Sequence, residues 1–457
     1  METQSWAEQE FAYADLGDQR RKKRLIQLAK QRGTQPNASI SQSCEDSAST
    51  KAAYRFYENS AISSQAILSS HIKTTQTRMN QESIVLAVQD TTQLDYSSHP
   101  ATQGLGTLQT KNQHGLIMHT TLAVTLSRVP LGVIHHQVWC RPEEEFGKKH
   151  RRKKRPIEEK ESQKWLSSLE ATSELSKEMP QTHIVSIGDR EADIYDLFAL
   201  SCSPYHDILI RASWDRKVAH PENHLWSFME SQSISGTLTV TVPRKGNQPV
   251  RQAELSVRYS QVTIRPPSHR KGLKPITLCG ILATEEESPK GIEPISWLLL
   301  TNVLTDTFED SCQRIQWYSC RWTIEIYHKV LKDGCRIEER QFEFAENIQR
   351  YLSLDMVVAW RVLYLTMLGR DMPELPCTAI FEAYEWQSLY CFIHKTHTPP
   401  NETPSLQQAV RWIAKLGGFM GRKGDGEPGV TVLWRGLQRL YDISETWLLF
   451  HIHSPDP

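Results

Sequence analysis

The sequence predicts an α/β core placed between two helical ends. Short apolar and β-branched runs between residues 84 and 187 indicate buried strands. From about 205 to 300 the apolar residues alternate with period two, which indicates a β-rich insertion with one buried face. Residues 1 to about 68, and the chain from residue 309 onward, follow helical spacing instead.

Composition places the chain among soluble globular proteins of more than one domain. It has 457 residues, of which 39% are hydrophobic and 23% charged. Nine cysteines without a Cys-x-x-Cys pair argue against a disulfide framework and a zinc module, and they fit a reducing cytoplasm. The N-terminus has no apolar core of the signal-peptide type. The apolar stretch 351–368 contains Asp355 and Arg361, so we expect a buried helix and no membrane partner.

Charge is balanced overall, but the basic residues are segregated into two blocks. The first block consists of Arg20, Arg21, Lys22, Lys23, Arg24, Lys30 and Arg32. The second lies in the loop "GKKHRRKKRP", residues 147–156. Each block is either a solvated face or a binding surface for a polyanion, and composition alone leaves both open.

The first basic block lies on a predicted amphipathic helix. Asp18 is placed to cap the start of this helix, and Gly33 to end it. Leu25, Leu28 and Ala29 share one face, which turns the basic side chains outward and suits DNA phosphates. A second polar and aromatic cluster follows, with Tyr54, Arg55 and Tyr57.

Two carboxylates follow predicted strands of the core. The apolar run 84–88 is followed by Gln89 and Asp90. The run 183–187 is followed by Gly188 and Asp189, directly before a predicted helix. Strands 114–127 and 130–139 belong to the same sheet. Functional residues often lie at the carboxyl ends of strands, although an aspartate there also serves as a turn or helix cap.

The segment "YSCRWTIEIYHKVLK", residues 318–332, predicts one continuous helix ended by Gly334. Its core face consists of Cys320, Ile324, Tyr327 and Leu331. The opposite, solvent-facing side carries Tyr318, Arg321, Trp322, Glu325, Lys329 and Lys332. A solvated polar face with incidental ion pairs explains the charges but not the two aromatic residues.

Asp90, Asp189 and Glu325 make a set of three carboxylates from two strands and one helix. Converging acids repel one another and are tolerable when a cation neutralises them. Ligation by oxygen alone favours Mg²⁺ or Mn²⁺ over zinc. Two such ions about 4 Å apart can support in-line phosphoryl transfer.

The segments "QDTTQLDY", "GDREADIY" and "YSCRWTIEIYHKVLK" resemble the three signature blocks of the DDE cut-and-paste transposases. The likeness is to the IS-four-type insertion-sequence family, which has a Tyr-Arg-Glu-Lys signature and includes the Tn-five transposase. Further segments match in the same order: "LGDQRRKKRL", "AYRF", "HHQVWCRP", "EKESQKWL", "WLLLT" and "IAKLGGFM". The resemblance covers nearly the whole chain.

This resemblance implies an RNase H-like catalytic core, a mixed sheet flanked by helices with a β-strand insertion. It implies a helical DNA-end-binding domain over 1–68 and a catalytic domain over 69–370, with the insertion at about 205–300. A helical dimerisation or interaction domain would occupy 371–457. The tail is short for the family, and the loop 147–156 is longer and more basic, which suits a clamp for flanking or target DNA or a tether.

The resemblance also implies roles for single residues. Asp90, Asp189 and Glu325 match the catalytic triad that binds two Mg²⁺ ions, with Mn²⁺ as a substitute. Tyr318, Arg321 and Lys332 match the positions that hold DNA phosphates. Trp297 matches a tryptophan that stacks on a flipped base, although a core residue at a strand start reads the same way. Further DNA contacts are expected at Trp322, His328, Lys329, Arg21, Arg24 and Arg55.

The function that the resemblance implies is DNA transposition of an insertion sequence. We expect Mg²⁺-dependent strand cleavage, hairpin formation and strand transfer, with a homodimer on double-stranded transposon ends and target DNA in the bacterial cytoplasm, associated with the nucleoid. One alternative is a catalytically inactive DNA-binding derivative, such as a repressor or inhibitor of transposition. Another takes the carboxylates for a glycosidase pair, which leaves the arginine blocks unexplained.

Overall fold

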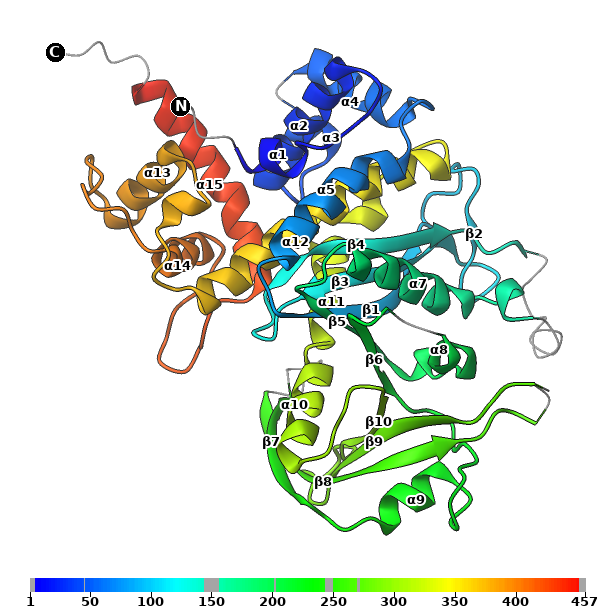
Figure 1. Cartoon of the computed structure of the whole chain (residues 1–457). Helices are drawn as coiled ribbons and strands as arrows, with labels where there is room; N and C mark the ends of the chain where they lie inside the picture. Colours follow the sequence, from blue (N-terminus) through cyan, green and yellow to red (C-terminus); the bar gives the residue numbers. More distant parts are fainter. Residues whose placement is uncertain are drawn as a thin grey trace.

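The computed structural model describes residues 5–44, 46–143, 156–200, 203–242, 250–268 and 272–451. Figure 1 shows a helical N-terminal region, a central mixed sheet, a second group of strands that extends this sheet, and a helical C-terminal region. The basic loop 147–156 lies outside the described residues apart from Pro156.

Within the described residues, the N-terminal region contains the helices α1 (Trp6–Glu10), α2 (Gln19–Thr34), α3 (Ile40–Ser43), α4 (Ser47–Glu58) and α5 (Ser64–Met79). Asp18 caps α2 as predicted, because its side chain accepts a hydrogen bond from the backbone nitrogen of Arg20. Gly33 does not end α2, which continues to Thr34. A Cβ at Gly33 would lie 2.4 Å from the ring of Trp6, so this glycine serves the close packing of α1 on α2.

The central sheet contains β1 (Ile84–Asp95), β2 (Gly106–Thr107), β3 (His114–Val124), β4 (Pro130–Trp139), β5 (His183–Gly188) and β6 (His206–Arg211). Strand β1 is parallel to β5, and β5 to β6, whereas β3 runs antiparallel to both β1 and β4. This mixed sheet flanked by helices is compatible with the expected RNase H-like core.

Four further strands continue the same sheet beyond β6. They are β7 (Gly236–Val242), β8 (Arg251–Ile264), β9 (Ile276–Glu285) and β10 (Ser296–Thr301), joined in the order β6-β10-β9-β8-β7 and antiparallel throughout. The β-rich insertion is therefore present, but it starts after β6. Residues 206–211 were predicted inside the insertion and instead form a parallel strand of the core.

Asp90 lies inside β1 rather than at the end of a strand, contrary to the prediction. Strand β1 pairs with β3 from Leu86 to Asp95, but with β5 only from Ile84 to Val88. Apolar patterning detected only the half of β1 that is buried on both sides. Beyond Val88 the strand has lost β5 as a neighbour, so Asp90 sits where the sheet opens.

Helices flank the core sheet, as Figure 1 shows. Helices α7 (Gln163–Lys177), α11 (Trp322–Lys329) and α12 (Ala345–Asp371) pack against core strands, and α8 (Tyr195–Ala199) packs on α7. Helices α9 (Leu225–Ser231) and α10 (Phe308–Ser319) instead pack on the strands of the insertion. Short 3₁₀ turns lie at Ile157–Glu159, Arg190–Ala192 and Ile337–Glu339. Helix α12 is the buried helix that the sequence predicted. It is long and apolar enough to cross a membrane by length and composition, but 89% of its most apolar window is buried.

The segment 318–332 is not one continuous helix. Helix α10 ends at Ser319, α11 begins at Trp322, and a π-helical turn covers Val330–Gly334. Because the axis breaks at Cys320 and Arg321, the angles of one straight helix do not apply across the segment. The break moves Tyr318 off the solvent side.

The C-terminal region consists of a 3₁₀ turn (Cys377–Ala379) and helices α13 (Ala383–His394), α14 (Leu406–Leu416) and α15 (Val430–His451).

A buried ion pair ties the N-terminal region to α12: the Arg32 guanidinium contacts the Asp355 carboxylate at 3.1 Å, and both side chains are almost fully buried. Arg32 was predicted to face outward with the other basic residues of α2, and this prediction is wrong.

Candidate active site

Asp90 is the most deeply buried of the three predicted carboxylates. Its side chain is 23% exposed, and one oxygen accepts a 2.8 Å hydrogen bond from the backbone nitrogen of Thr91. The pKa of Asp90 is raised to about 6, mainly by burial, with smaller upward contributions from the charges of Asp189 and Glu325 and an opposing one from Arg321. The three acids therefore share one electrostatic environment.

Asp189 follows β5 directly and caps the 3₁₀ turn at Arg190–Ala192. Its Oδ1 atom accepts a 2.8 Å hydrogen bond from the backbone nitrogen of Glu191. The capping role that the sequence left open is real, yet it uses a single carboxylate oxygen. Burial raises the pKa of Asp189, which is the behaviour of a carboxylate held away from water rather than of an exposed cap.

Glu325 lies in the first turn of α11, and about half of its side chain is exposed. One guanidinium nitrogen of Arg321 lies 2.5 Å from the Glu325 carboxylate, and another lies 3.7 Å from that of Asp90. Arg321 therefore bridges two of the three acids, one from β1 and one from α11. Its side chain is 12% exposed, which strengthens the attraction relative to that of a surface pair.

The donor set suits a hard divalent cation, although the side chains do not converge as ligands in this structure. Among the residues that the structure describes, no three His, Cys, Asp or Glu side chains form a group that could hold a metal ion as they stand. All three candidate donors are carboxylates, however, and their mutual repulsion is felt at Asp90. Arg321 supplies the positive charge that such a set requires.

Three aromatic side chains pack beside the carboxylates. The ring of Trp297 on β10 makes edge contacts with Tyr318 at 5.3 Å and with Trp322 at 5.8 Å between centroids. Trp297 is 5% exposed and Tyr318 is 4% exposed, so both are core residues in this structure. The prediction of Tyr318 on the solvent-facing side is wrong because the helix breaks after Ser319. A base could reach Trp297 only if these rings parted.

Arg211 is a residue of this site that the sequence analysis missed. It ends β6, and its side chain hydrogen-bonds to Tyr318 and to the backbone oxygen of Ser296, the latter at 2.9 Å. Burial lowers its pKa. No local motif marks Arg211, because its position depends on β6 lying parallel and adjacent to β5. The only available signal was a basic residue at the end of an apolar run.

The remaining predicted contacts on α11 and on the π-helical turn after it divide into exposed and buried residues. Lys329 is exposed, and Lys332 lies 3.3 Å from the carboxylate of Glu338. His328 is 6% exposed, and burial lowers its pKa to about 3, so it is a neutral core residue. Its prediction as a solvent-facing DNA contact therefore does not match this structure.

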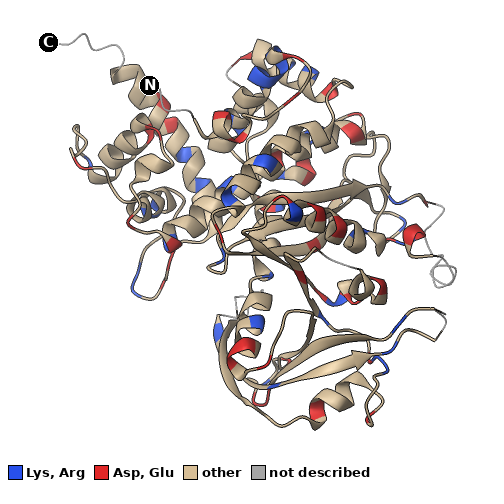
Figure 2. Cartoon of the chain, viewed as in Figure 1, with Lys and Arg blue, Asp and Glu red and all other residues tan. Residues whose placement is uncertain are grey.

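The basic side chains of the N-terminal helices have a different setting. Figure 2 shows Lys and Arg on these helices, well away from the strands of the insertion. Arg21 and Arg24 are partly exposed, and Arg55 on α4 is exposed. The guanidinium of Arg21 donates to the backbone oxygen of Leu16. All three therefore remain available to an external partner.

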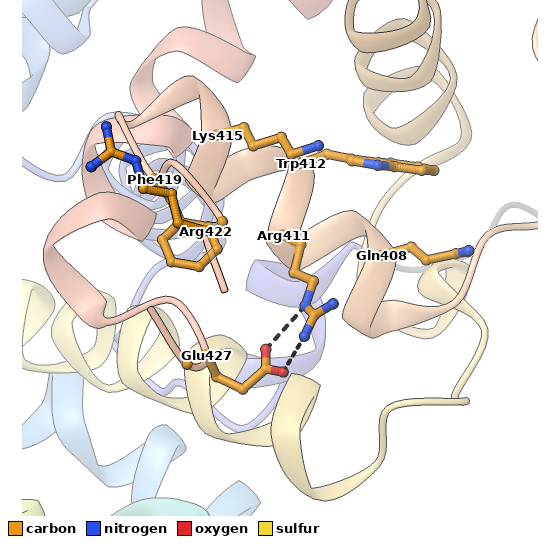
Figure 3. A pocket seen from close by; sticks show the side chains of 9 residues that line it. Gln408, Arg411, Trp412, Lys415, Phe419, Arg422 and Glu427 are labelled. Carbon is orange, nitrogen blue, oxygen red and sulfur yellow. Dashed lines mark hydrogen bonds and ion pairs between the residues drawn. The ribbon is translucent and has the colours of Figure 1, made fainter. Parts of the chain in front are cut away.

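A separate pocket of about 570 Å³ lies in the C-terminal region. Figure 3 shows Arg411 and Glu427 joined by an ion pair across it, with a distance of 2.5 Å. Its lining is completed by Gln408, Trp412, Lys415, Phe419, Gly421, Arg422 and Gly426. None of these residues belongs to β1, β5 or α11, so the pocket is not part of the carboxylate site.

Two segments of the chain match models of known protein families. Residues 3–62 match a transposase DNA-binding domain, which covers α1 to α4. Residues 357–447 match the dimerisation domain of the Tn5 transposase, which begins within α12 and ends within α15.

The matched models describe a DNA-binding domain at the N-terminal helices and a dimerisation domain at the C-terminal helices, which supports a class of protein that binds DNA and forms a homodimer. Both descriptions are of transposase domains, and the two flank the carboxylate site from either end of the sequence. Together they support a transposase of the Tn5 type.

Proposed function

We propose that this chain is a DDE transposase that moves an insertion sequence by a cut-and-paste route. The observation that carries the proposal is the meeting of Asp90, Asp189 and Glu325 in one electrostatic environment, beside Arg321. This site lies between segments that match a DNA-binding domain and a dimerisation domain. The IS-four-type signature and the catalytic activity are part of the proposal.

Asp90, Asp189 and Glu325 would hold two Mg²⁺ ions, with Mn²⁺ as a substitute. When bound, such ions activate the attacking oxygen and neutralise charge at the scissile phosphate. Asp90 and Asp189 favour a divalent cation because both are held partly away from water, and Asp90 is also repelled by the charges of Asp189 and Glu325.

Arg321 has a second task once the carboxylates are neutralised. Its guanidinium now balances Asp90 and Glu325, and a cation bound there would release it toward a non-bridging phosphate oxygen. Arg211 and Tyr318 lie beside it, and Lys332 follows on the π-helical turn. These groups can hold a phosphate in line with the attacking oxygen, and this fixed positive charge stabilises the transition state.

One such site can perform each step of cut-and-paste transposition. Cleavage, hairpin formation and strand transfer are all in-line displacements at phosphorus, and they differ only in the nucleophile. Water is the nucleophile in the first cut and again when the hairpin is reopened, which restores the 3′-hydroxyl. That hydroxyl is the nucleophile in hairpin formation and in strand transfer. The same positioning residues therefore serve throughout.

Strand cleavage on the inverted repeat that flanks the coding region tests this proposal. With Mg²⁺, the wild-type chain should nick that repeat, and Glu325→Ala should lower the rate by at least about 100-fold because one carboxylate of the set is lost. Binding of the repeat should persist, since α1 to α4 are unchanged. Glu309→Ala, at an exposed carboxylate on α10, is the matched control and should nick normally.

Two outcomes would contradict the proposal. If Glu325→Ala nicked as fast as Glu309→Ala, the carboxylate site would be misassigned. If the wild-type chain bound its ends but nicked them with neither Mg²⁺ nor Mn²⁺, the chain would be a DNA-binding derivative without catalysis.

A further inference from the structure

Trp214 is the most unusual exposed side chain near the carboxylate site. The chain has 13 tryptophans, all of them within the described residues, and Trp214 alone is largely exposed, at 66%. An exposed indole offers a large flat apolar face to water, which is unfavourable unless a ligand covers it. The residue follows β6, in the loop "ASWDRKV".

The loop that carries Trp214 is anchored by hydrogen bonds to a buried carboxylate. Asp193 accepts hydrogen bonds of 2.7 Å from the backbone nitrogens of Ser213 and Trp214. It also pairs with Arg216, whose guanidinium lies over the rings of Tyr195 and Phe198. Only the backbone of Trp214 takes part in this anchoring, so its side chain is presented outward on a fixed support.

Two connections place this support beside the carboxylate site. Asp193 lies four residues after Asp189, at the end of the turn that Asp189 caps. Trp214 lies three residues after Arg211, so their Cα atoms are no more than about 11 Å apart. Arg211 itself contacts Tyr318 next to Arg321. A DNA strand held at the carboxylates would pass the indole of Trp214 within a few nucleotides of the carboxylate site.

Trp297 does not offer the same possibility in this structure. Its ring is 5% exposed and makes edge contacts with Tyr318 and Trp322. The ring of Trp214 is open to a base without any rearrangement of packed rings, whereas that of Trp297 is not.

We propose that Trp214 is a stacking platform for an unpaired base of the DNA strand held at the carboxylate site. The ligand class is a nucleobase on a strand that carries negative charge, and exposed Arg190 and Lys217 lie on neighbouring segments to meet its phosphates. Base stacking on aromatic side chains tolerates any sequence, because every base has a π face. The inference rests on the proposed function, since it assumes that DNA occupies this site.

Fluorescence of 2-aminopurine tests the proposal in the full-length chain. Duplexes carry the inverted repeat with 2-aminopurine at single positions around the cleavage point, and the Glu325→Gln background keeps them uncut. At one position within about three nucleotides of that point, Trp214→Ala should brighten the complex, because the base loses its stacking partner. With Trp214→Phe, the fluorescence of 2-aminopurine should stay quenched. Affinity for the duplex should fall roughly 5- to 100-fold with alanine.

Two controls accompany this measurement. Ile234→Ala, at another exposed apolar side chain outside the site, should change neither fluorescence nor affinity. Trp214→Ala should keep the melting temperature of the wild type, since the anchoring bonds come from the backbone. If alanine left fluorescence unchanged at every position, or if only Trp297→Phe brightened the complex, the inference would be overturned.

The wild-type chain is assayed for Mg²⁺-dependent nicking alongside. If the wild-type chain nicks DNA but substitution of Trp214 has no effect, the stacking proposal is wrong and the proposed function stands. A Trp214 effect without nicking removes the proposed catalysis and leaves the base contact.

Discussion

At the scale of single residues, the carboxylate site stores electrostatic strain. Asp90 sits largely buried next to two other acids, with Arg321 as its compensating charge. Burial disfavours the charged form of Asp90, so an uncharged residue of similar shape should suit the position better. Such strain is typical of residues kept for chemistry rather than for stability.

Asp90→Asn should therefore stabilise the fold at alkaline pH. The pKa of Asp90 is about 6 in the folded chain against its usual 3.8, so the folded state binds more protons between these values. Stability is consequently lost as pH rises from about 4 to 6, and the cost of about 3 kcal/mol is fully present above pH 6. Asparagine removes this cost.

Thermal melting at several pH values measures the effect. The melting temperature of Asp90→Asn should exceed that of the wild type at pH 8, and the difference should shrink toward zero as pH falls to about 4. Asp333→Asn, at an exposed carboxylate, should show no such trend. A variant that is less stable than the wild type at pH 8 would show that Asp90 is a structural anchor.

At the scale of elements, sequence patterns located most strands and helices but not how they join. The Asp18 cap and the buried α12 were correctly predicted, because capping and long apolar spacing are local signals. The break before Arg321 was missed, since nothing in a helical wheel reports where an axis bends. The continuation of β1 beyond Asp90 was missed because it depends on pairing with β3.

The contact of α2 with α12 makes a prediction about stability. Asp355→Ala should lower the free energy of unfolding by about 3–5 kcal/mol, because Arg32 would be left charged and buried. The guanidinium would keep only its hydrogen bonds to the backbone oxygens of Gln35, Pro36 and Ala38. Urea denaturation compares the variant with the wild type.

Replacing both partners provides the control. Arg32→Met with Asp355→Leu removes the buried charge altogether and should recover part of the stability lost by Asp355→Ala. If the double variant were as unstable as Asp355→Ala, the loss of stability would come from packing rather than from the unpaired charge.

At the scale of the whole molecule, one chain carries helices that match a DNA-binding domain, then a carboxylate site, then helices that match a dimerisation domain. The signature segments were enough to expect Asp90, Asp189 and Glu325 in one place, because these segments resemble the signature blocks of a known family. The roles of Arg211 and Trp214 could not be read from the sequence, since both depend on β6 joining the core sheet beside β5. Burial of Trp297 and His328 likewise follows from tertiary packing and not from residue type.

The central claim is that Asp90, Asp189 and Glu325 hold divalent cations together, and oxidative self-cleavage with Fe²⁺ in place of Mg²⁺ tests it most directly. With ascorbate and peroxide, radicals formed at bound iron cut the backbone nearby. The account predicts cuts close to residues 90, 189 and 325 at once, all suppressed by excess Mg²⁺ and by Glu325→Ala. Cuts confined to other parts of the chain, or to one of the three positions alone, would contradict it.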